Sequence, residues 1–343
     1  MKKTILYILS VISLLAGFST SAQKNPVLPE DMSKPRIRVI IDNDFGGDPD
    51  GLFQLAHQIL SPSVEIRGII GSFIRQGGFF DAPETASSAC NAANELLTIM
   101  KMNQKLQVYE GSNSGLLDLK TPQISDGAKV IVKEAMLDDT ELPLYVLCGA
   151  GLTDIASAYL MEPRIARRLT LIWIGGPEYA DLAIPPPGYT PLEYNLGIDI
   201  KAGQVIFNNS DIPVWQVPRN AYRQALLSYS ELLLKVKTQG NLGEYLTDKI
   251  EYLMKLTPKY NFSIGETYIL GDNPLVLLTA LQSSYDADPS SSSYIIKPAP
   301  GINDNGLYET NLSARNIRVY NDLDIRLMFE DFFMKLALFN MQK

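Results

Sequence analysis

Hydrophobic and polar positions along the chain follow two alternating patterns. Short apolar runs bounded by turn residues predict buried strands, and longer stretches with apolar residues three or four positions apart predict amphipathic helices. The predicted strands are residues 38–41, 66–71, 142–148, 169–174, 213–217 and 317–320. The predicted helices are residues 52–60, 86–100, 126–137, 153–160, 201–208 and 273–282. Strands that alternate with helices predict an α/β fold with a mostly parallel central sheet and helices on both faces.

Two long segments interrupt this alternation. Residues 177–194 contain three consecutive prolines, and residues 256–272 carry Tyr260, Phe262 and Tyr268. Long loops in a compact domain are commonly functional. The aromatic residues in the second segment therefore favour a lid over a ligand.

The beginning of the chain has the pattern of a secretory signal. Lys2 and Lys3 precede an apolar run, and a small-residue segment ends at Ala22. The apolar run is too short to predict a membrane span. We therefore expect a signal peptide at residues 1–22 that is cleaved after Ala22, export to a periplasm, a polar lead at 23–35 and a single domain at 36–343.

The charge of the mature chain narrows the choice of partners. Removing residues 1–22 takes away two lysines and no acidic residue, which leaves 28 basic against 38 acidic residues. This negative balance argues against nucleic acids and anionic membranes as partners and is compatible with small neutral molecules or cations. The two cysteines, Cys90 and Cys148, lie in apolar patterns that predict buried free thiols.

Four aspartates directly follow the first predicted strand: Asp42, Asp44, Asp48 and Asp50. The period of two in a strand predicts that Asp42 and Asp44 project together beyond its end, where ligands bind in parallel sheets. Carboxylates this close repel one another and raise each other's pKa unless a cation neutralises them. No Cys or His lies among them, so the residues favour an oxygen-binding cation such as Ca²⁺ or Mg²⁺.

Single members of this cluster could also have a purely structural role. Asp48 before Pro49 is a common N-cap pattern, and Asp42 could cap a turn. An EF-hand that begins at Asp42 is excluded because its twelfth position is Phe53. A phosphatase of the haloacid-dehalogenase type is a weaker alternative, since the later lysine and acidic pair are not evident.

Three further segments have polar residues or glycines directly after a predicted strand or at the start of a predicted helix. Residues 147–154 leave a strand through two glycines and lack the lysine of a phosphate loop. Glu193 and Asn195 would point the same way if their segment is extended, and Asp199 has the position of a helix cap. Asn273 before Pro274 is predicted to cap the late helix, which frees Asp272 for another role.

In this order, the motifs resemble the inosine–uridine-preferring nucleoside hydrolases over nearly the whole mature chain. The family's Asp-x-Asp-x-Gly-x-Asp-Asp signature is matched by residues 42–51, and its Leu-Thr-Asn-Ile-Ala segment by residues 152–156. Residues 162–165, 175–176, 193–199 and 272–275 match the motifs that follow. The Gly-Gly-Asp-Pro-Asp variant is similar to a secreted bacterial branch.

The resemblance implies hydrolysis of the N-glycosidic bond of a ribonucleoside to base and ribose with the help of Ca²⁺. Asp44 would ligate the ion and act as general base toward a water molecule that attacks the anomeric carbon. Asp48 or Asp50, Asp272 and a backbone carbonyl at Cys148 or Gly149 would complete the metal site. The implied substrate-binding residues are Asp48, Glu193, Asn195 and Asp272. Family members often form dimers or tetramers, which implies a possible homo-oligomer.

The chain also departs from the family pattern. Pro49 splits the family's adjacent Asp pair, and Gly271 stands where a histidine protonates the leaving base. The single histidine, His57, lies in the first predicted helix, where a structural role is expected. Leaving-group activation would then come from aromatic stacking or from a loop tyrosine. Two alternatives follow: a Ca²⁺-dependent hydrolase of another ribosyl or glycosyl compound, and a non-catalytic periplasmic sugar- or nucleoside-binding protein.

Overall fold

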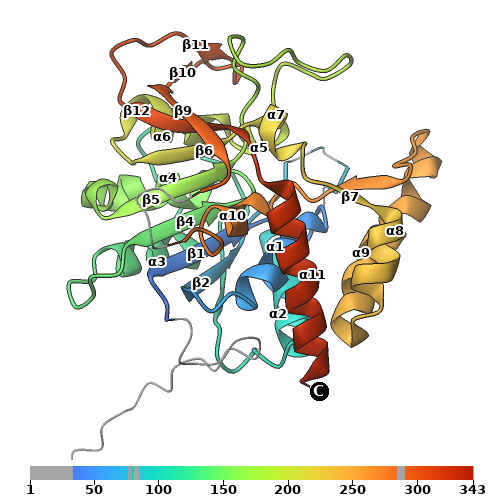
Figure 1. Ribbon diagram of the computed structural model, residues 1–343. Helices are drawn as coiled ribbons and strands as arrows, with labels where there is room; N and C mark the ends of the chain where they lie inside the picture. The colour runs from blue at the N-terminus through green and yellow to red at the C-terminus, as the bar shows by residue number, and fades with distance from the viewer. Residues whose placement is uncertain (1–33, 76, 78, 81–84, 284–289, 343) are drawn as a thin grey trace, which may run out of the picture.

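An eight-stranded sheet forms the centre of the protein (Figure 1). The computed structural model describes residues 34–75, 77, 79–80, 85–283 and 290–342. The predicted signal segment 1–22 lies outside these ranges, as does the lead segment 23–35 except for its last two residues. Within the described ranges, no helix combines the length and apolar character needed to cross a membrane.

The strands follow the order β3-β2-β1-β4-β5-β6-β12-β9. Every neighbouring pair is parallel except β12 and β9, which are antiparallel. The strands are β1 (Ile37–Asn43), β2 (Val64–Gly71), β3 (Val108–Glu110), β4 (Leu144–Cys148), β5 (Leu169–Ile174), β6 (Val214–Val217), β9 (Ser293–Pro298) and β12 (Asn316–Asp322). The predicted α/β fold with a mostly parallel sheet is confirmed.

Helices cover both faces of this sheet (Figure 1). Val39 and Ile41 of β1 pack in the core under α1 (Asp50–Ile59), α2 (Thr85–Ile99) and α11 (Ile325–Met341). Ile40 packs in the opposite core under α3 (Asp126–Ala135), α4 (Thr153–Met161) and α6 (Ile200–Asn209). A buried strand supplies side chains to both faces in alternation, which explains why β1 is an unbroken apolar run.

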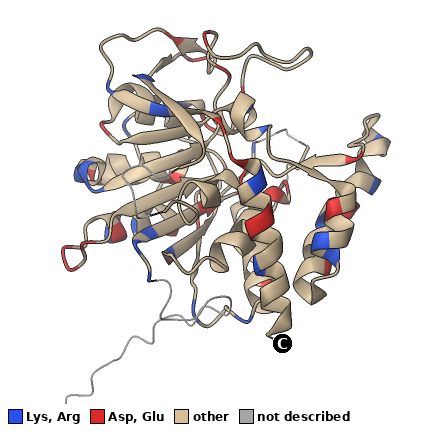
Figure 2. Cartoon of the chain, in the orientation of Figure 1, with Lys and Arg blue, Asp and Glu red and all other residues tan. Residues whose placement is uncertain are grey.

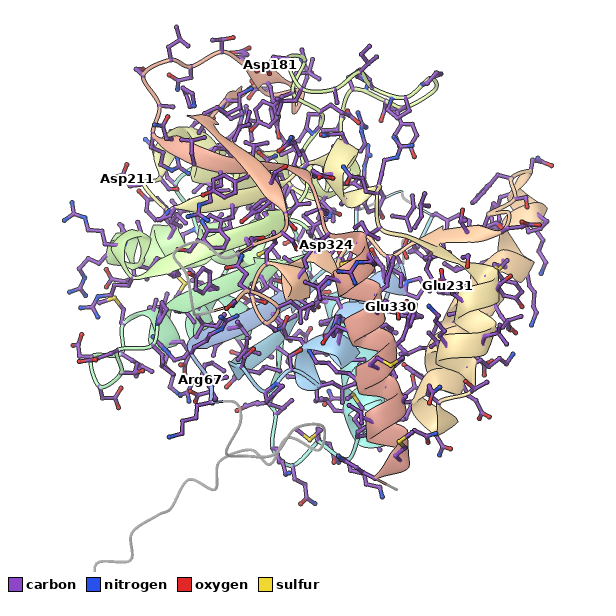
Figure 3. All side chains as sticks on the ribbon, in the orientation of Figure 1. Arg67, Asp181, Asp211, Glu231, Asp324 and Glu330 are labelled. Carbon is purple, nitrogen blue, oxygen red and sulfur yellow. The ribbon has the colours of Figure 1, made fainter. Side chains whose placement is uncertain are left out.

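A smaller group of elements lies outside this three-layer core. It contains α8 (Tyr229–Glu231), a π-helical turn at Leu232–Lys237 and α9 (Gly240–Leu256). Figure 3 shows Glu231 of α8 near Glu330 of α11, and Lys235 forms ion pairs with both at 3.2 and 2.7 Å. Both acidic and basic residues occur along α9 and α11 (Figure 2).

Short elements complete the chain. Two small two-stranded sheets, β7 with β8 and β10 with β11, are antiparallel. The remaining elements are β7 (Leu226–Ser228), β8 (Thr267–Ile269), β10 (Gly301–Ile302), β11 (Tyr308–Glu309), α5 (Tyr194–Ile198), α7 (Arg219–Tyr222), α10 (Pro274–Leu277) and 3₁₀ turns at Pro163–Arg167 and Thr257–Tyr260. The long loop 177–193 has no helix or strand, as predicted, whereas the second predicted loop contains β8.

Most predicted elements match the structure to within two residues. The exception is the predicted helix 273–282, because α10 contains only Pro274–Leu277. The chain from 278 to 282 forms turns in place of further helix. The apolar residues Leu275 to Leu278 nevertheless enter the core, which is why their pattern resembled a longer helix.

Candidate functional site

Three carboxylates from distant parts of the chain meet at the carboxyl end of β1. Asp44 follows the last residue of β1, Asp50 begins α1, and Asp272 precedes α10. Asp44 and Asp272 are 7% and 3% exposed. A Cβ atom placed on Gly271 would lie 3.4 Å from Asp50 Oδ2, which puts the Asp50 carboxylate against the turn that carries Asp272.

Asn43, for which the sequence pattern predicted no role, links these residues. Its Nδ2 donates to Asp272 Oδ2 at 2.9 Å, and its Oδ1 accepts from the backbone N–H of Asp44 at 2.8 Å. Gly149 leaves the space for this contact, because a Cβ there would lie 2.8 Å from Asp272 Cγ and even closer to the Asn43 amide. The glycine after β4 therefore lets the backbone approach the cluster, as its position after a strand suggested.

The cluster carries more negative charge than its surroundings favour. Burial and the charges of Asp272 and Asp48 raise the pKa of Asp44 well above its usual value. Burial and the same two neighbours raise the pKa of Asp50 well above its usual value. Burial also raises the pKa of Asp272 to about 7, although its hydrogen bond from Asn43 acts in the opposite direction. A bound cation would remove this repulsion.

Asp48 lies at the rim of the cluster. Its side chain is exposed, and its Oδ1 accepts a hydrogen bond from the Tyr268 hydroxyl at 2.6 Å. The predicted N-cap role is wrong, since the N-cap position of α1 is Pro49 and no side chain of the described residues caps this helix; Asp48 Oδ1 accepts from the backbone N–H of Asp50 at 3.4 Å. Asp50, and not Asp48, therefore faces Asp272.

Asp42 belongs to a different group of polar residues, which corrects the prediction that Asp42 and Asp44 project together. Asp42 still lies within β1, where its carboxylate accepts hydrogen bonds from Ser72 and, at 3.7 Å, from the thiol of Cys148. Burial and the charge of Asp154 raise the pKa of Asp42 well above its usual value. Within β1, Asp42 and Asn43 face opposite sides of the sheet, and β1 ends at Asn43, so Asp44 lies outside the strand and no longer follows its period of two.

Both cysteines are free thiols, as predicted. Cys148 is buried and Cys90 is partly buried. The Cys148 side chain is directed toward Asp42 and away from the carboxylate cluster, and burial raises the pKa of this thiol well above its usual value. As a ligand, Cys148 could contribute only its backbone carbonyl.

Glu193 and Asn195 both reach the carboxyl ends of the neighbouring strands. Glu193 is buried and its Oε2 accepts from the N–H groups of Gly176 and Leu196 at 2.8 and 3.0 Å. Asn195 Nδ2 donates to the carbonyls of Gly149 and Ile174 at 3.0 and 2.8 Å. The segment is not extended: Glu193 caps α5, and Asn195 lies in its first turn.

Asp199 has the predicted helix-cap role. Its Oδ1 accepts from the backbone N–H of Ala202 in α6 at 3.0 Å. Asn273, in contrast, makes no side-chain cap to α10. Its Nδ2 lies 3.3 Å from Nδ1 of His57, so the predicted capping role is wrong. His57 itself is fully buried, consistent with the structural role predicted for it.

A cleft of about 610 Å³ borders this site beyond β5 and β6, and Tyr179, Lys297 and Tyr308 are among its lining residues. At its floor, Arg219 forms a buried two-point ion pair with Glu178, at 2.8 and 2.5 Å. Gly176 lies next to both Glu193 and the cleft, because its N–H donates to Glu193 Oε2 and a Cβ there would collide with the Tyr308 hydroxyl. The proline-rich loop 177–194 was the only signal for this cleft in the sequence.

The donor set fits a hard cation. It consists of carboxylate oxygens alone, and the raised pKa values of Asp44, Asp50 and Asp272 show that their charges are poorly compensated. Across the described residues, no three His, Cys, Asp or Glu side chains already have the arrangement of a formed metal site.

The titration of Asp272 should be visible in the stability of the metal-free protein. Asp272 has a pKa of about 7 when folded, against 3.8 as a reference, so between these values the folded state holds a proton that the unfolded state lacks. The free energy of unfolding should then fall as the pH rises through this window. His57, whose pKa burial lowers to about 4, acts in the opposite sense below about pH 6.5.

Comparison with Asp272→Asn isolates this effect. We expect the stability advantage of the metal-free wild type over this variant to shrink between pH 5.5 and pH 8 in chemical denaturation with a chelator present. An advantage that grows with pH would contradict the raised pKa of Asp272.

Comparison with protein families identifies one match. The model described as "Inosine-uridine preferring nucleoside hydrolase" matches residues 39–317. This range includes the whole cluster, from Asn43 to Asp272. A comparison with curated protein sequences finds no significant match.

Solved structures share the fold at low sequence identity. The purine-preferring ribonucleoside hydrolase from Gardnerella vaginalis is 16% identical, with a TM-score of 0.70 over 89% of this chain and 99% of that one. A plant nucleoside hydrolase, PpNRh1, is 17% identical, with a TM-score of 0.63 over 88% and 99%. An inosine-uridine preferring nucleoside hydrolase from Bacillus anthracis is 14% identical, with a TM-score of 0.59 over 88% and 99%.

Proposed function

The chain belongs to the inosine-uridine preferring nucleoside hydrolase family and is an N-glycosyl hydrolase, and we propose that it cleaves ribonucleosides to free base and ribose in a Ca²⁺-dependent reaction. The observation that carries this proposal is the meeting of Asp44, Asp50 and Asp272 around Asn43 at the carboxyl end of β1. Parallel sheets bind their ligands at this edge.

Calcium is the proposed ion because all side-chain donors are hard oxygens. Asp44, Asp50 and Asp272 would hold it, together with a backbone carbonyl at Cys148 or Gly149. When bound, Ca²⁺ would lower the pKa of a water molecule and orient the ribose hydroxyls. We assign the ligand role to Asp50 over Asp48, since Asp50 faces Asp272 and Tyr268 holds Asp48 at the rim.

Asp44 is the proposed general base. The backbone N–H of Asp44 donates to Asn43 Oδ1, which fixes the position of the Asp44 backbone and thus of the attached carboxylate. Asp44 accepts the proton of the attacking water as the water adds to the anomeric carbon and the bond to the base breaks. Asp48 at the rim of the cluster and Glu193 at the start of α5 would accept hydrogen bonds from sugar hydroxyls. Asn195 holds the ends of β4 and β5 together through two carbonyls and would contribute through its Oδ1.

Two tyrosines are the candidates for assisting departure of the base. A Cβ on Gly271 would lie 3.3 Å from Cδ2 of Tyr222, so this ring occupies the space next to the position where the family has its histidine. Tyr222 donates to Glu193 at 2.9 Å and Tyr268 donates to Asp48 at 2.6 Å. Burial and these carboxylates raise the pKa of both phenols, so both hydroxyls stay protonated and can donate a hydrogen bond to a leaving base, whereas the raised pKa disfavours full transfer of the proton.

The replacement of the family's histidine also supports a second candidate substrate. A ribosyl or glycosyl compound whose leaving group departs without protonation by an imidazole would suit the same cluster. The carboxylates and the attacking water would act in the same way. Only the group released would differ.

A substrate panel tests the proposal. Purified protein with CaCl₂ is offered purine and pyrimidine ribonucleosides, the matching 2′-deoxynucleosides and other ribosides, and the release of reducing sugar is measured. We expect release from ribonucleosides, loss of release with a chelator, and recovery on adding Ca²⁺. Release only from the other ribosides would favour the second candidate, and no release from any compound would refute both.

We also propose that the protein is exported and that its signal segment is removed after Ala22. The basic start, apolar run and small-residue end of residues 1–22 support this proposal. Intact-mass measurement of the protein from a secreting host should give a chain that begins at Gln23. A chain that retains Met1 and remains in the cytoplasm would contradict export.

A further inference from the structure

His57 connects the last helix of the chain to the turn that carries Asp272. It lies in α1, fully buried, and packs against the ring of Phe332 in α11 at 5.1 Å between centroids. Its Nε2 lies 2.8 Å from Asp331 Oδ2, and its Nδ1 lies 3.3 Å from Asn273 Nδ2. The imidazole thus spans from α11 to the residue that follows Asp272.

These partners determine which nitrogen carries the proton. An amide nitrogen can only donate, so Nδ1 of His57 accepts from Asn273, and Nε2–H donates to Asp331. Asp331 is also paired with Lys335 at 2.6 Å, and Lys335 in turn donates to Ser61 at 2.8 Å. Asp331 and Lys335 are the charged groups of α11 that face the ring. Burial lowers the pKa of His57 to about 4, which keeps the imidazole neutral at physiological pH.

The turn around Asp272 is short, so side chains from other elements are needed to fix its position. α10 has only four residues, and the turn is closed by two backbone hydrogen bonds, Asn273 N–H to Leu270 O at 3.2 Å and Leu275 N–H to Asp272 O at 3.0 Å. Asn43 of β1 holds the side chain of Asp272 on one side. His57 of α1 holds Asn273 on the other.

We propose that His57 is a positioning residue for Asp272: as a neutral imidazole it joins the Asp331–Lys335 pair of α11 to Asn273, and thereby holds the Asp272 carboxylate in the cluster with Asp44 and Asp50. Its effect on Ca²⁺ binding rests on the proposed function. Its effect on the turn does not. Replacing a residue that holds a metal ligand in place through hydrogen bonds commonly lowers the metal affinity by about 10- to 100-fold.

Two substitutions of His57 separate the two hydrogen bonds. In His57→Asn, Oδ1 takes the place of Nδ1 and can still accept from Asn273, while the bond to Asp331 is lost. In His57→Gln, Nε2 takes the place of the ring Nε2 and can still donate to Asp331, while the bond from Asn273 is lost. A purely structural histidine would lose stability in both variants without distinguishing between them.

The measurements are Ca²⁺ titration calorimetry and hydrogen exchange of the amides of Asn273 and Leu275. We expect His57→Gln to weaken Ca²⁺ binding by about 10-fold and to speed exchange in this turn. We expect His57→Asn to stay within about 3-fold of the wild type in Ca²⁺ affinity. Gln58→Leu is the matched control, because Gln58 is buried in the same helix and contacts Thr279 without touching the turn residues 271–273.

Asn273→Ala provides a second route if His57→Gln does not fold. It removes the other partner of the same hydrogen bond and should weaken Ca²⁺ binding to a similar degree, and the double variant should lose no more than either single one. Equal effects of His57→Asn and His57→Gln, or unchanged exchange of the turn in His57→Gln and Asn273→Ala, would overturn the positioning role. Absence of Ca²⁺ binding by the wild type would refute the calcium proposal, while the exchange data would still decide the role of His57.

Discussion

Asp44→Asn is expected to lower kcat/KM for the best ribonucleoside by on the order of 10³-fold or more, because it removes a proton acceptor and a cation ligand in one substitution. The amide keeps the size of the carboxylate, so the packing at the end of β1 should persist. In the metal-free protein, removing one of the repelling charges should leave the melting temperature unchanged or raise it, since Asp44 is buried and interacts with the charges of Asp272 and Asp48.

The matched control for this experiment is Asp154→Asn. Asp154 is equally buried, and burial raises its pKa to about 6, but its carboxylate contacts Ser112 and Ser125 and lies outside the cluster. The family motif that residues 152–156 resemble has Asn at this position. We expect Asp154→Asn to retain activity within about 3-fold. Comparable losses in the two variants would mean that general destabilisation, and not the chemistry of Asp44, explains the result.

Asp50→Asn and Asp48→Asn should differ sharply, which decides between the two carboxylates that flank Pro49. Asp50 faces Asp272 in the cluster, and its pKa is raised by burial and by Asp272. Its replacement should weaken Ca²⁺ binding by on the order of 10²-fold and lower activity accordingly. Asp48 is exposed and bonded to Tyr268, so its replacement should change Ca²⁺ affinity by less than about 5-fold and act mainly on KM.

Calorimetric titration with CaCl₂ measures the change in Ca²⁺ affinity, and steady-state kinetics at saturating Ca²⁺ measure the change in kcat and KM. Activity lost by Asp50→Asn should be partly recovered at high Ca²⁺, because mass action refills a weakened site. A larger loss of Ca²⁺ affinity in Asp48→Asn than in Asp50→Asn would reverse the assignment. The insertion of Pro49 would then have left the first carboxylate of the family pair as the ligand.

Much of the fold was predictable from periodicity, and the exceptions have identifiable causes. The strands of the central sheet are buried on both faces, so their apolar runs stand out against the polar turns beside them. α11 was not predicted because apolar residues lie around most of its circumference: Phe332 and Leu336 are buried whereas Met334 is exposed, which obscures a single apolar stripe. The short paired strands β7 and β8 carry too few residues to show any period.

The candidate site was predictable as a set of residues and less so as an arrangement. The aspartates after β1, the glycines after β4, Glu193 and Asp272 all reach one edge of the sheet, as the order of the motifs suggested. The role of Asn43 was not predicted because an uncharged amide between two aspartates carries no signal of its own for metal binding or catalysis. Tyr222 was missed because no local pattern indicates that α7 would place its hydroxyl 2.9 Å from Glu193.

By itself the sequence determined the class of fold, the end of the sheet that carries the chemistry and the oxygen-rich character of the donors, because each depends on local order: apolar runs, turns and the residue types that follow them. Only the tertiary structure decided which carboxylates act together. Asp42 and Asn43 face opposite sides of the sheet, and Asp44 joins the side of Asn43 because β1 ends before it. The partners of Asp272 lie 229 residues away in β1 and, through Asn273, 216 residues away in α1, distances along the chain that no local pattern encodes.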